Sequence, residues 1–196
     1  MSMVSARPLT LADVAMPRAG VLQNVVLVVL ASLLTAAAAQ VEIRLPWTPV
    51  PITGQTFMVL LTGAVLGARR AFLAMALYLV EGSCGLPFFA GGAAGLAKLL
   101  GPSGGYLVAF PFAALVTGLL AERAWDRKPV TMFFAMLLGS TVIFGLGLAQ
   151  LSRFVPANQL VAAGLAPFVI GDFVKSALAA GVFPLAWKWA GGRESK

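Results

Sequence analysis

The sequence predicts an all-α membrane protein with six transmembrane helices, because it is very apolar and its apolar residues form repeated long segments. Of its 196 residues, 60% are hydrophobic and only 11% are charged, and the mean hydropathy is +0.92. Soluble globular chains carry about 25% charged residues. An apolar helix needs about 20 residues to cross a bilayer. The whole chain, 1–196, is therefore expected to form a single integral membrane domain.

Six apolar segments are separated by polar, glycine-rich or proline-rich stretches. The expected spans cover 21–40, 55–68, 71–86, 104–121, 130–151 and 164–190. The apolar segment 55–68 is short, so the second span is expected to start within the loop that precedes it. Three prolines, Pro46, Pro49 and Pro51, prevent a continuous helix before the second span. Residues 87–103 predict a glycine-rich loop with a short helix over 94–100. The first span also resembles a signal peptide with a cleavage-like alanine run at 37–39, which is the alternative interpretation of that segment.

The basic residues predict the orientation of the chain. With the N-terminus inside, ten lysines and arginines face the cytoplasm and three face the outside: Arg7, Arg18, Arg69, Arg70, Arg123, Arg127, Lys128, Lys188, Arg193 and Lys196 against Arg44, Lys98 and Arg153. Cytoplasmic loops of membrane proteins are enriched in such residues. We therefore expect cytoplasmic N- and C-termini, with 1–20 as a cytoplasmic segment and 191–196 as a cytoplasmic tail. The same bias explains the net charge of +7 without any nucleic acid.

The composition also disfavours enzymatic function. The sequence has no histidine and one cysteine, Cys84, so it lacks the commonest general base and metal ligand. It contains no GxxxxGK[ST] motif for binding a nucleotide phosphate. Neither a catalytic residue, a metal site nor a cofactor is expected.

Three ionisable residues fall within the expected spans: Glu81, Asp172 and Lys175. A charge at the bilayer centre costs about 2.5–3.5 kcal/mol on insertion scales, so such residues usually face the protein interior. Asp172 and Lys175 are three positions apart and share one helix face. They predict either a structural ion pair or the polar floor of a pocket that a ligand enters from outside. Glu81 lies near the outer end of its span, and is either an interface residue or, with Asp172, a proton site of a solitary carrier or channel.

Loops on the outer side predict a lidded, partly apolar pocket near the outer face. A stiff proline-containing loop carries two uncharged polar side chains, Thr53 and Gln55, and a rigid loop loses little entropy when it orders on a ligand. Glycines and aromatic residues accumulate on the same side, namely Phe88, Phe89, Gly91, Gly92 and Tyr106.

Small residues repeat every fourth position in the first span, at Ala31, Thr35 and Ala39, and a GxxxG motif covers 63–67. Such faces allow helices to approach closely. Both internal packing and docking of another membrane subunit are consistent with them.

These segments together resemble the BioY family, the biotin-binding S components of energy-coupling factor (ECF) transporters. The resemblance covers about residues 25–190 and rests on four motifs: PVPITGQTF at 49–57, GLPFFAGG at 85–92, GPSGGY at 101–106, and the Asp172-x-x-Lys175 pair. It implies a six-helix vitamin-binding protein in the plasma membrane of a prokaryote, with biotin as transported ligand rather than cofactor. Its implied partners are a membrane coupling subunit, which would meet Ala31, Thr35 and Ala39, and a pair of cytoplasmic ATPases. Whether the chain forms a homo-oligomer is left open.

The chemistry of biotin agrees with this resemblance. Asp172 can accept from a ureido N–H and Lys175 can donate to the ureido oxygen, while the aromatic residues cover the ring and acyl chain. The opposite orientation, with Lys175 on the ligand carboxylate, is the alternative assignment. The ligand-binding residues expected are Thr53, Gln55, Phe88, Phe89, Gly91, Gly92, Tyr106, Asp172 and Lys175. The alternative function is a solitary proton-coupled carrier or channel for a small polar solute.

Overall fold

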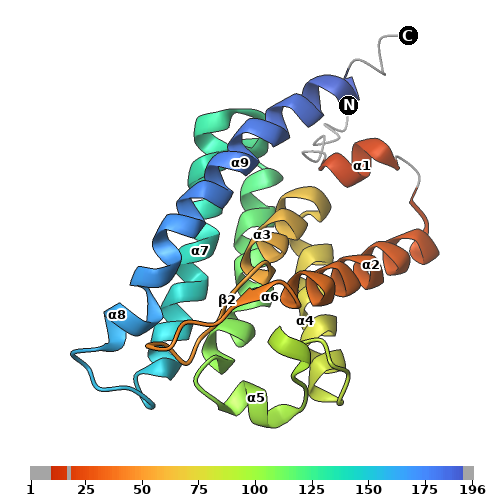
Figure 1. Ribbon diagram of the computed structural model, residues 1–196. Coiled ribbons are helices and arrows are strands. Elements are labelled where there is room, and N and C mark those ends of the chain that lie inside the picture. Colours follow the sequence, from red (N-terminus) through yellow and green to blue (C-terminus); the bar gives the residue numbers. More distant parts are fainter. Residues whose placement is uncertain (1–9, 17–18, 192–196) are drawn as a thin grey trace, which may run out of the picture.

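A computed structural model describes residues 10–16 and 19–191 of the protein (Figure 1). Four basic residues used to predict the orientation, Arg7, Arg18, Arg193 and Lys196, lie outside the described residues. The α-helices are α1 (Leu11–Ala15), α2 (Val21–Ala39), α3 (Gln55–Leu66), α4 (Ala68–Ser83), α5 (Leu96–Leu100), α6 (Gly104–Ala121), α7 (Pro129–Leu151), α8 (Leu160–Gly164) and α9 (Ala166–Gly191). Two 3-10 turns, η1 (Ala90–Gly92) and η2 (Trp125–Arg127), and two short strands, β1 (Glu42–Ile43) and β2 (Ile52–Thr53), complete the described structure.

Six helices occupy the segments predicted as spans, but they differ in length. Four helical segments are long and apolar enough to cross a membrane: α2, α6, α7 and the segment 160–190 formed by α8 and α9. The other two are shorter, since α3 has 12 residues and α4 has 16. The structure thus agrees with an apolar, mostly helical protein, while helix length alone does not establish six crossings.

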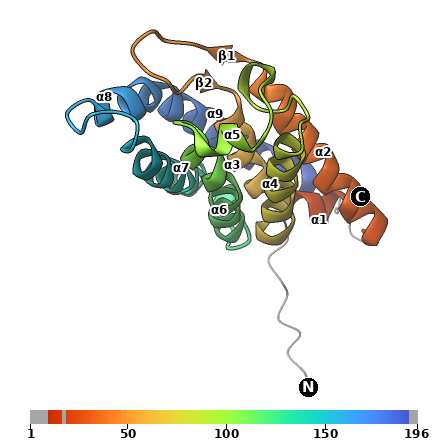
Figure 2. The ribbon, with the colours of Figure 1, turned by 90° about the horizontal axis from the view of Figure 1, so that it is seen from below.

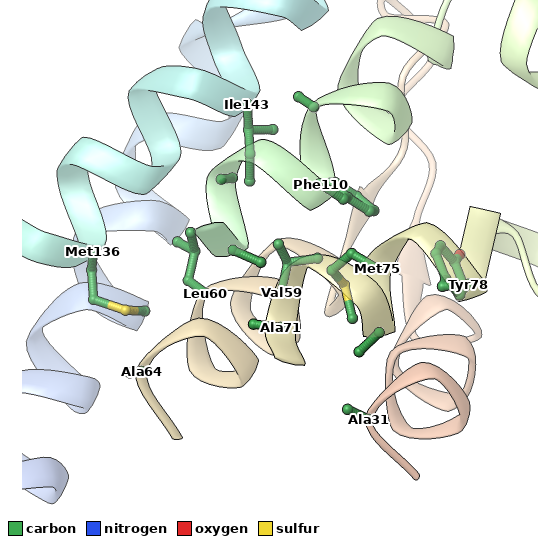
Figure 3. Packing of buried hydrophobic residues seen from close by; sticks show 14 of the residues in the cluster. Ala31, Val59, Leu60, Ala64, Ala71, Met75, Tyr78, Phe110, Met136 and Ile143 are labelled. Carbon is green, nitrogen blue, oxygen red and sulfur yellow. The ribbon is translucent and has the colours of Figure 1, made fainter. Parts of the chain in front are cut away.

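Helix α6 lies at the centre of the bundle, where it packs against α3, α4 and α7. In its apolar span 72% of residues are buried, against 22% in α2. Glycine permits the closest crossings, because a Cβ added at Gly63 would lie 2.6 Å from the Ala114 carbonyl oxygen of α6. The GxxxG motif therefore serves internal packing between α3 and α6. Figure 3 shows the surrounding apolar core, which includes Val59, Leu60 and Phe110.

The small residues of α2 are buried within the protein, although they were predicted to contact a partner subunit. Ala31 is 7% exposed, and Thr35 and Ala39 are fully buried. Thr35 lies 3.8 Å from the sulfur of Met75 on α4 (its Oγ1 to Sδ). In this structure the small-residue face is buried, and its short side chains let α2 and α4 approach closely.

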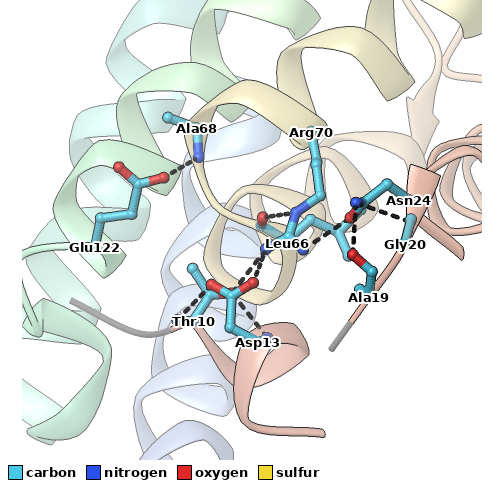
Figure 4. A network of polar contacts seen from close by, with 9 residues as sticks. All are labelled: Thr10, Asp13, Ala19, Gly20, Asn24, Leu66, Ala68, Arg70 and Glu122. Atoms are coloured by element: carbon cyan, nitrogen blue, oxygen red, sulfur yellow. Dashed lines mark hydrogen bonds and ion pairs between the residues drawn. The ribbon is translucent and has the colours of Figure 1, made fainter. Parts of the chain in front are cut away.

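A polar network fixes α1 against one end of the bundle (Figure 4). Nη2 of Arg70 on α4 lies 2.7 Å from Oδ1 of Asp13, and it also donates to Oγ1 of Thr10 at 3.1 Å. Desolvation raises the pKa of the Asp13 carboxyl, but hydrogen bonds from Thr10 and the charge of Arg70 outweigh it and lower this pKa overall. At the same end, the Glu122 carboxylate accepts from the Ala68 amide at 2.9 Å. This last contact gives a partner to an amide at the start of α4 that the helix itself leaves unpaired.

The opposite end of the bundle is covered by the connection between α2 and α3. Its two strands pair in antiparallel register, Glu42 with Thr53 and Ile43 with Ile52. The loop between them reaches toward α8 (Figure 2), where Thr48 Oγ1 donates to the Ala163 carbonyl at 2.7 Å. The prolines predicted a non-helical stretch here. The structure shows that this stretch forms a hairpin whose loop is hydrogen-bonded to α8 through Thr48 and Ala163.

Candidate ligand-binding site

A cavity opens beside β2 and extends between α3, α6 and α9. The space free of atoms is about 670 Å³, and this volume includes the open solvent at the mouth of the cavity. Its wall consists of Val50, Pro51, Ile52, Thr53, Gln55, Thr56, Ala90, Lys98, Ser103, Tyr106, Leu107, Phe110, Phe144, Phe168, Gly171, Asp172 and Lys175. Five of the nine residues predicted to bind ligand are among them: Thr53, Gln55, Tyr106, Asp172 and Lys175.

Asp172 and Lys175 both line this cavity, and each is held by a different part of the protein. Ser140 Oγ on α7 donates to Asp172 Oδ1 at 2.7 Å. Lys175 Nζ donates to the Thr53 carbonyl at 3.0 Å and to Thr56 Oγ1 at 3.1 Å. Among the described ion pairs, none joins Asp172 to Lys175. The carboxylate and the ammonium are therefore oriented separately, and each retains hydrogen-bonding capacity beyond these contacts.

Aromatic rings form one wall of the cavity. The ring centroids of Tyr106 and Phe168 are 6.2 Å apart, and Phe168 stands at the same distance from Phe144. The Tyr106 hydroxyl is turned away to donate to the Gly164 carbonyl at 2.7 Å. Gly147 provides room for this ring, because a Cβ there would lie 2.4 Å from Tyr106 Cδ1. The tyrosine thus offers the cavity its apolar ring while its hydroxyl fastens α6 to the end of α8.

The side chains of Thr53 and Gln55 take part in a series of hydrogen bonds at the cavity edge. Thr53 Oγ1 donates to Gln55 Oε1 at 3.0 Å, and Gln55 Nε2 donates to the Tyr78 hydroxyl. The Tyr78 hydroxyl in turn donates to the Phe88 carbonyl at 2.9 Å. These hydrogen bonds fix the start of α3 against α4 and the loop that follows it.

Four residues expected to bind ligand lie outside the cavity wall: Phe88, Phe89, Gly91 and Gly92. Phe89 is fully buried and packs edge-to-face on Tyr78 with ring centroids 5.6 Å apart. Gly91 has a φ of 68°, and a Cβ there would lie 2.7 Å from Oε1 of Glu42. The GLPFFAGG segment therefore supports the hairpin and the core, and its neighbour Ala90 is the residue that reaches the cavity.

The GPSGGY segment also serves mainly to pack helices. A Cβ at Gly104 would lie 1.7 Å from the Leu99 carbonyl oxygen, and one at Gly105 would lie 2.3 Å from the Leu146 carbonyl oxygen. Gln150 on α7 donates to the carbonyls of Leu99 and Gly101, each at 2.8 Å. These close contacts place Ser103 and Tyr106 in the cavity wall.

Several residues in or beside the cavity wall carry no signal in the sequence. Phe144 and Phe168 resemble any other apolar residue of a span, and no sequence signal distinguishes the serine that supports Asp172. Lys98 was assigned only to an outer loop, but it lines the cavity as well. Glu81, considered as a partner of Asp172 in a proton path, instead accepts a hydrogen bond from Ser32 on α2 and is absent from the cavity wall. The described residues contain no cluster of acidic residues or cysteine that could hold a metal ion.

The sequence model of the BioY family matches residues 7–192. The chain belongs to the BioY family. A relative from Pyrococcus horikoshii, called "Probable biotin transporter BioY", is 39% identical over 157 residues, which cover 80% of this chain and 91% of that one. The "Biotin transporter BioY" of Thermotoga maritima is 39% identical over 140 residues, covering 70% and 81% of the two chains.

The fold has a counterpart among solved structures. The crystal structure of the S-component for biotin from an ECF-type ABC transporter superposes with a TM-score of 0.75, and the alignment covers 85% of this chain and 92% of that one. Sequence identity in this pair is 23%, so the likeness establishes the arrangement of helices. Membership of this family places the chain among transport proteins rather than enzymes.

Proposed function

We propose that this chain captures biotin from the outer side of the membrane as the substrate-binding subunit of an ECF transporter. The observation that carries the proposal is the pair Asp172 and Lys175, oriented separately in a cavity with an aromatic wall. The ureido group of biotin has two N–H donors and one carbonyl acceptor. Asp172 accepts from a ureido N–H and the remaining N–H of Lys175 donates to the ureido oxygen. The rings of Tyr106 and Phe168 cover the apolar thioether and acyl chain.

The proposed topology has six membrane crossings in a prokaryotic plasma membrane, with both termini in the cytoplasm and the cavity near the outer face. Figure 1 places α1 and the C-terminal end of α9 at one end of the bundle, and α5 and α8 at the other. A 12-residue helix such as α3 is about 18 Å long, shorter than the hydrocarbon core of about 30 Å. Its crossing is completed by residues 50–53, which line the cavity, and irregular backbone is tolerated at membrane depth where it lines a cavity.

The energy for uptake is proposed to come from other subunits. The sequence has no phosphate-binding GxxxxGK[ST] motif, so the partners expected are a membrane coupling subunit and cytoplasmic ATPases. The described structure buries Ala31, Thr35 and Ala39, and their contact with a coupling subunit would require α2 to separate from α4.

Isothermal titration of the purified protein tests the binding function. Biotin is expected to bind stoichiometrically, whereas thiamine and riboflavin give no binding. Asp172→Ala is expected to abolish binding without unfolding the protein. Glu81→Gln is the matched control, because this second acid of the spans bonds to Ser32 away from the cavity.

The outcomes separate the site from the function. Undiminished biotin binding by Asp172→Ala would remove the site assignment, and absence of biotin binding by the unaltered protein would remove the proposed function. Uptake into proteoliposomes that lack ATPase subunits, accompanied by alkalinisation, would instead identify a solitary proton-coupled carrier.

A further inference from the structure

Lys98 is a second cationic residue in the wall of the cavity. It lies on the short helix α5, is half-buried, and lines the same cavity as Asp172 and Lys175. No other Asp, Glu, Lys or Arg is among the lining residues. Within the described part of the chain its ammonium forms neither an ion pair nor a hydrogen bond, in contrast to Lys175, which bonds to Thr53 and Thr56.

The backbone that carries Lys98 is nevertheless firmly placed. Gln150 Nε2 donates to the carbonyls of Leu99 and Gly101, which are neighbours of Lys98 in the chain. The amide of Gly95, at the start of α5, donates to the Gly82 carbonyl at 2.8 Å. The protein thus holds α5 at the cavity while leaving the flexible lysine side chain able to meet a ligand.

Lys98 reaches the cavity from a different side than Asp172 and Lys175. Helix α5 packs on α4 and α6, whereas α9 packs on α7 and α8. Figure 2 looks onto the end of the bundle that carries α5 and shows this helix near the hairpin. A ligand that contacts both α9 and α5 must therefore present polar groups at two separate points, with its apolar part along the aromatic wall.

The charges of the wall favour an anionic ligand. With Asp172 ionised and both lysines protonated, the three charged residues sum to one positive charge. A ligand with a single carboxylate brings the site to neutrality, and such a pairing is much stronger in a partly desolvated cavity than in water. Lys175 already donates two of its three N–H groups to the protein, which leaves Lys98 as the lysine with all its donors unused.

We propose that Lys98 binds the carboxylate end of the ligand and so fixes the orientation of the ligand, with its ureido ring at α9. This inference rests on the proposed function, since biotin is the ligand that carries both groups. Lys98 is thereby a specificity residue, which distinguishes free biotin from forms whose carboxylate is esterified or joined to an amine.

Titration of Lys98→Met with biotin and with biotin methyl ester tests this assignment. The unaltered protein is expected to bind biotin more tightly than the ester. Lys98→Met is expected to weaken biotin binding by about 10- to 100-fold, the effect of losing one charge-assisted hydrogen bond, while leaving the affinity for the ester unchanged. Lys98→Arg keeps the charge and is expected to retain the preference for biotin. Arg153→Met is the matched control, because Arg153 is an exposed basic residue of an outer connector and does not line the cavity.

Several results would overturn the assignment. Equal losses for biotin and ester in Lys98→Met, or no loss for either, would show that this ammonium does not recognise the carboxylate. Loss of the preference for biotin in Lys175→Met, with Lys98→Met unaffected, would reverse the orientation of the ligand. If the unaltered protein binds neither biotin nor its methyl ester, both the proposed function and this inference fail. Titration of the unaltered protein with biotin alone detects that outcome.

Discussion

Two substitutions of Tyr106 are expected to affect the stability of the protein and its affinity for ligand differently. Its ring lines the cavity and stands 6.2 Å from that of Phe168, while its buried hydroxyl donates to the Gly164 carbonyl at 2.7 Å. Tyr106→Phe removes the hydroxyl alone and leaves the carbonyl without its partner. Tyr106→Leu also removes the Tyr106 ring from the aromatic wall, while Phe144 and Phe168 remain.

The magnitudes follow from these two contacts. Leaving a buried acceptor unpaired costs about 1–3 kcal/mol, so Tyr106→Phe is expected to lower the free energy of unfolding by that amount and leave biotin affinity within about twofold. An aromatic contact contributes about 0.5–1.5 kcal/mol, so Tyr106→Leu is expected to weaken biotin binding by about 2- to 13-fold and to destabilise the protein further.

Thermal unfolding in detergent and isothermal titration measure the two effects on the same preparations. The reasoning is refuted if Tyr106→Phe weakens binding as much as Tyr106→Leu while its unfolding temperature stays unchanged. That result would mean that the hydroxyl faces the ligand rather than Gly164.

Two further predictions concern packing and pH. Gly147→Ala is expected to destabilise the protein by about 1–3 kcal/mol through overpacking, because the new Cβ would lie 2.4 Å from the Tyr106 ring, whereas Gly145→Ala on the same helix meets open space and is expected to be neutral or stabilising by thermal unfolding. Equal destabilisation by both would point to the helix backbone rather than to the Tyr106 contact. Burial raises the pKa of the Asp126 carboxyl in η2, against the opposing hydrogen bond from the Trp187 indole at 2.6 Å. The folded protein therefore holds the Asp126 proton more tightly than the unfolded chain does. The free energy of unfolding is expected to fall as the pH rises from the ordinary aspartate pKa through the raised pKa. Asp126→Asn is expected to remove this component of the pH profile of thermal unfolding.

Local sequence patterns predicted the helices closely where the apolar segments are long. Helix α6 has the predicted bounds, and α2 and α7 differ from theirs by one residue. Such segments can satisfy their backbone groups only by forming helices in an apolar environment, so hydropathy alone suffices. The hairpin and the short helices α1 and α8 were not predicted, because their placement depends on distant partners such as Arg70 and Ala163.

Residues of the cavity wall were predicted where the residue type is costly to bury, and were not predicted where it is ordinary in an apolar segment. Asp172 and Lys175 are conspicuous within an apolar segment, since a charge there needs a compensating function or partner. Phe144 and Phe168 are ordinary residues of a span, and only the packing of α7 against α9 brings them together in the cavity wall. The same packing brings Ser140 to Asp172. Gly91 and Gly92 lie outside the cavity wall. A glycine in a sequence marks a close approach of the backbone, but it does not say whether a ligand or another element makes that approach.

The amino-acid sequence by itself determined that this chain is a helical membrane protein and which helix face carries its buried charges, because hydropathy and helical periodicity are local properties. Only the tertiary structure decided that Phe88, Phe89 and Gly91 support the fold while Lys98 reaches the cavity, and that the small residues of α2 pack inside. Those outcomes depend on which elements meet in space, and distances between elements far apart in the chain are set by the packing of the whole bundle.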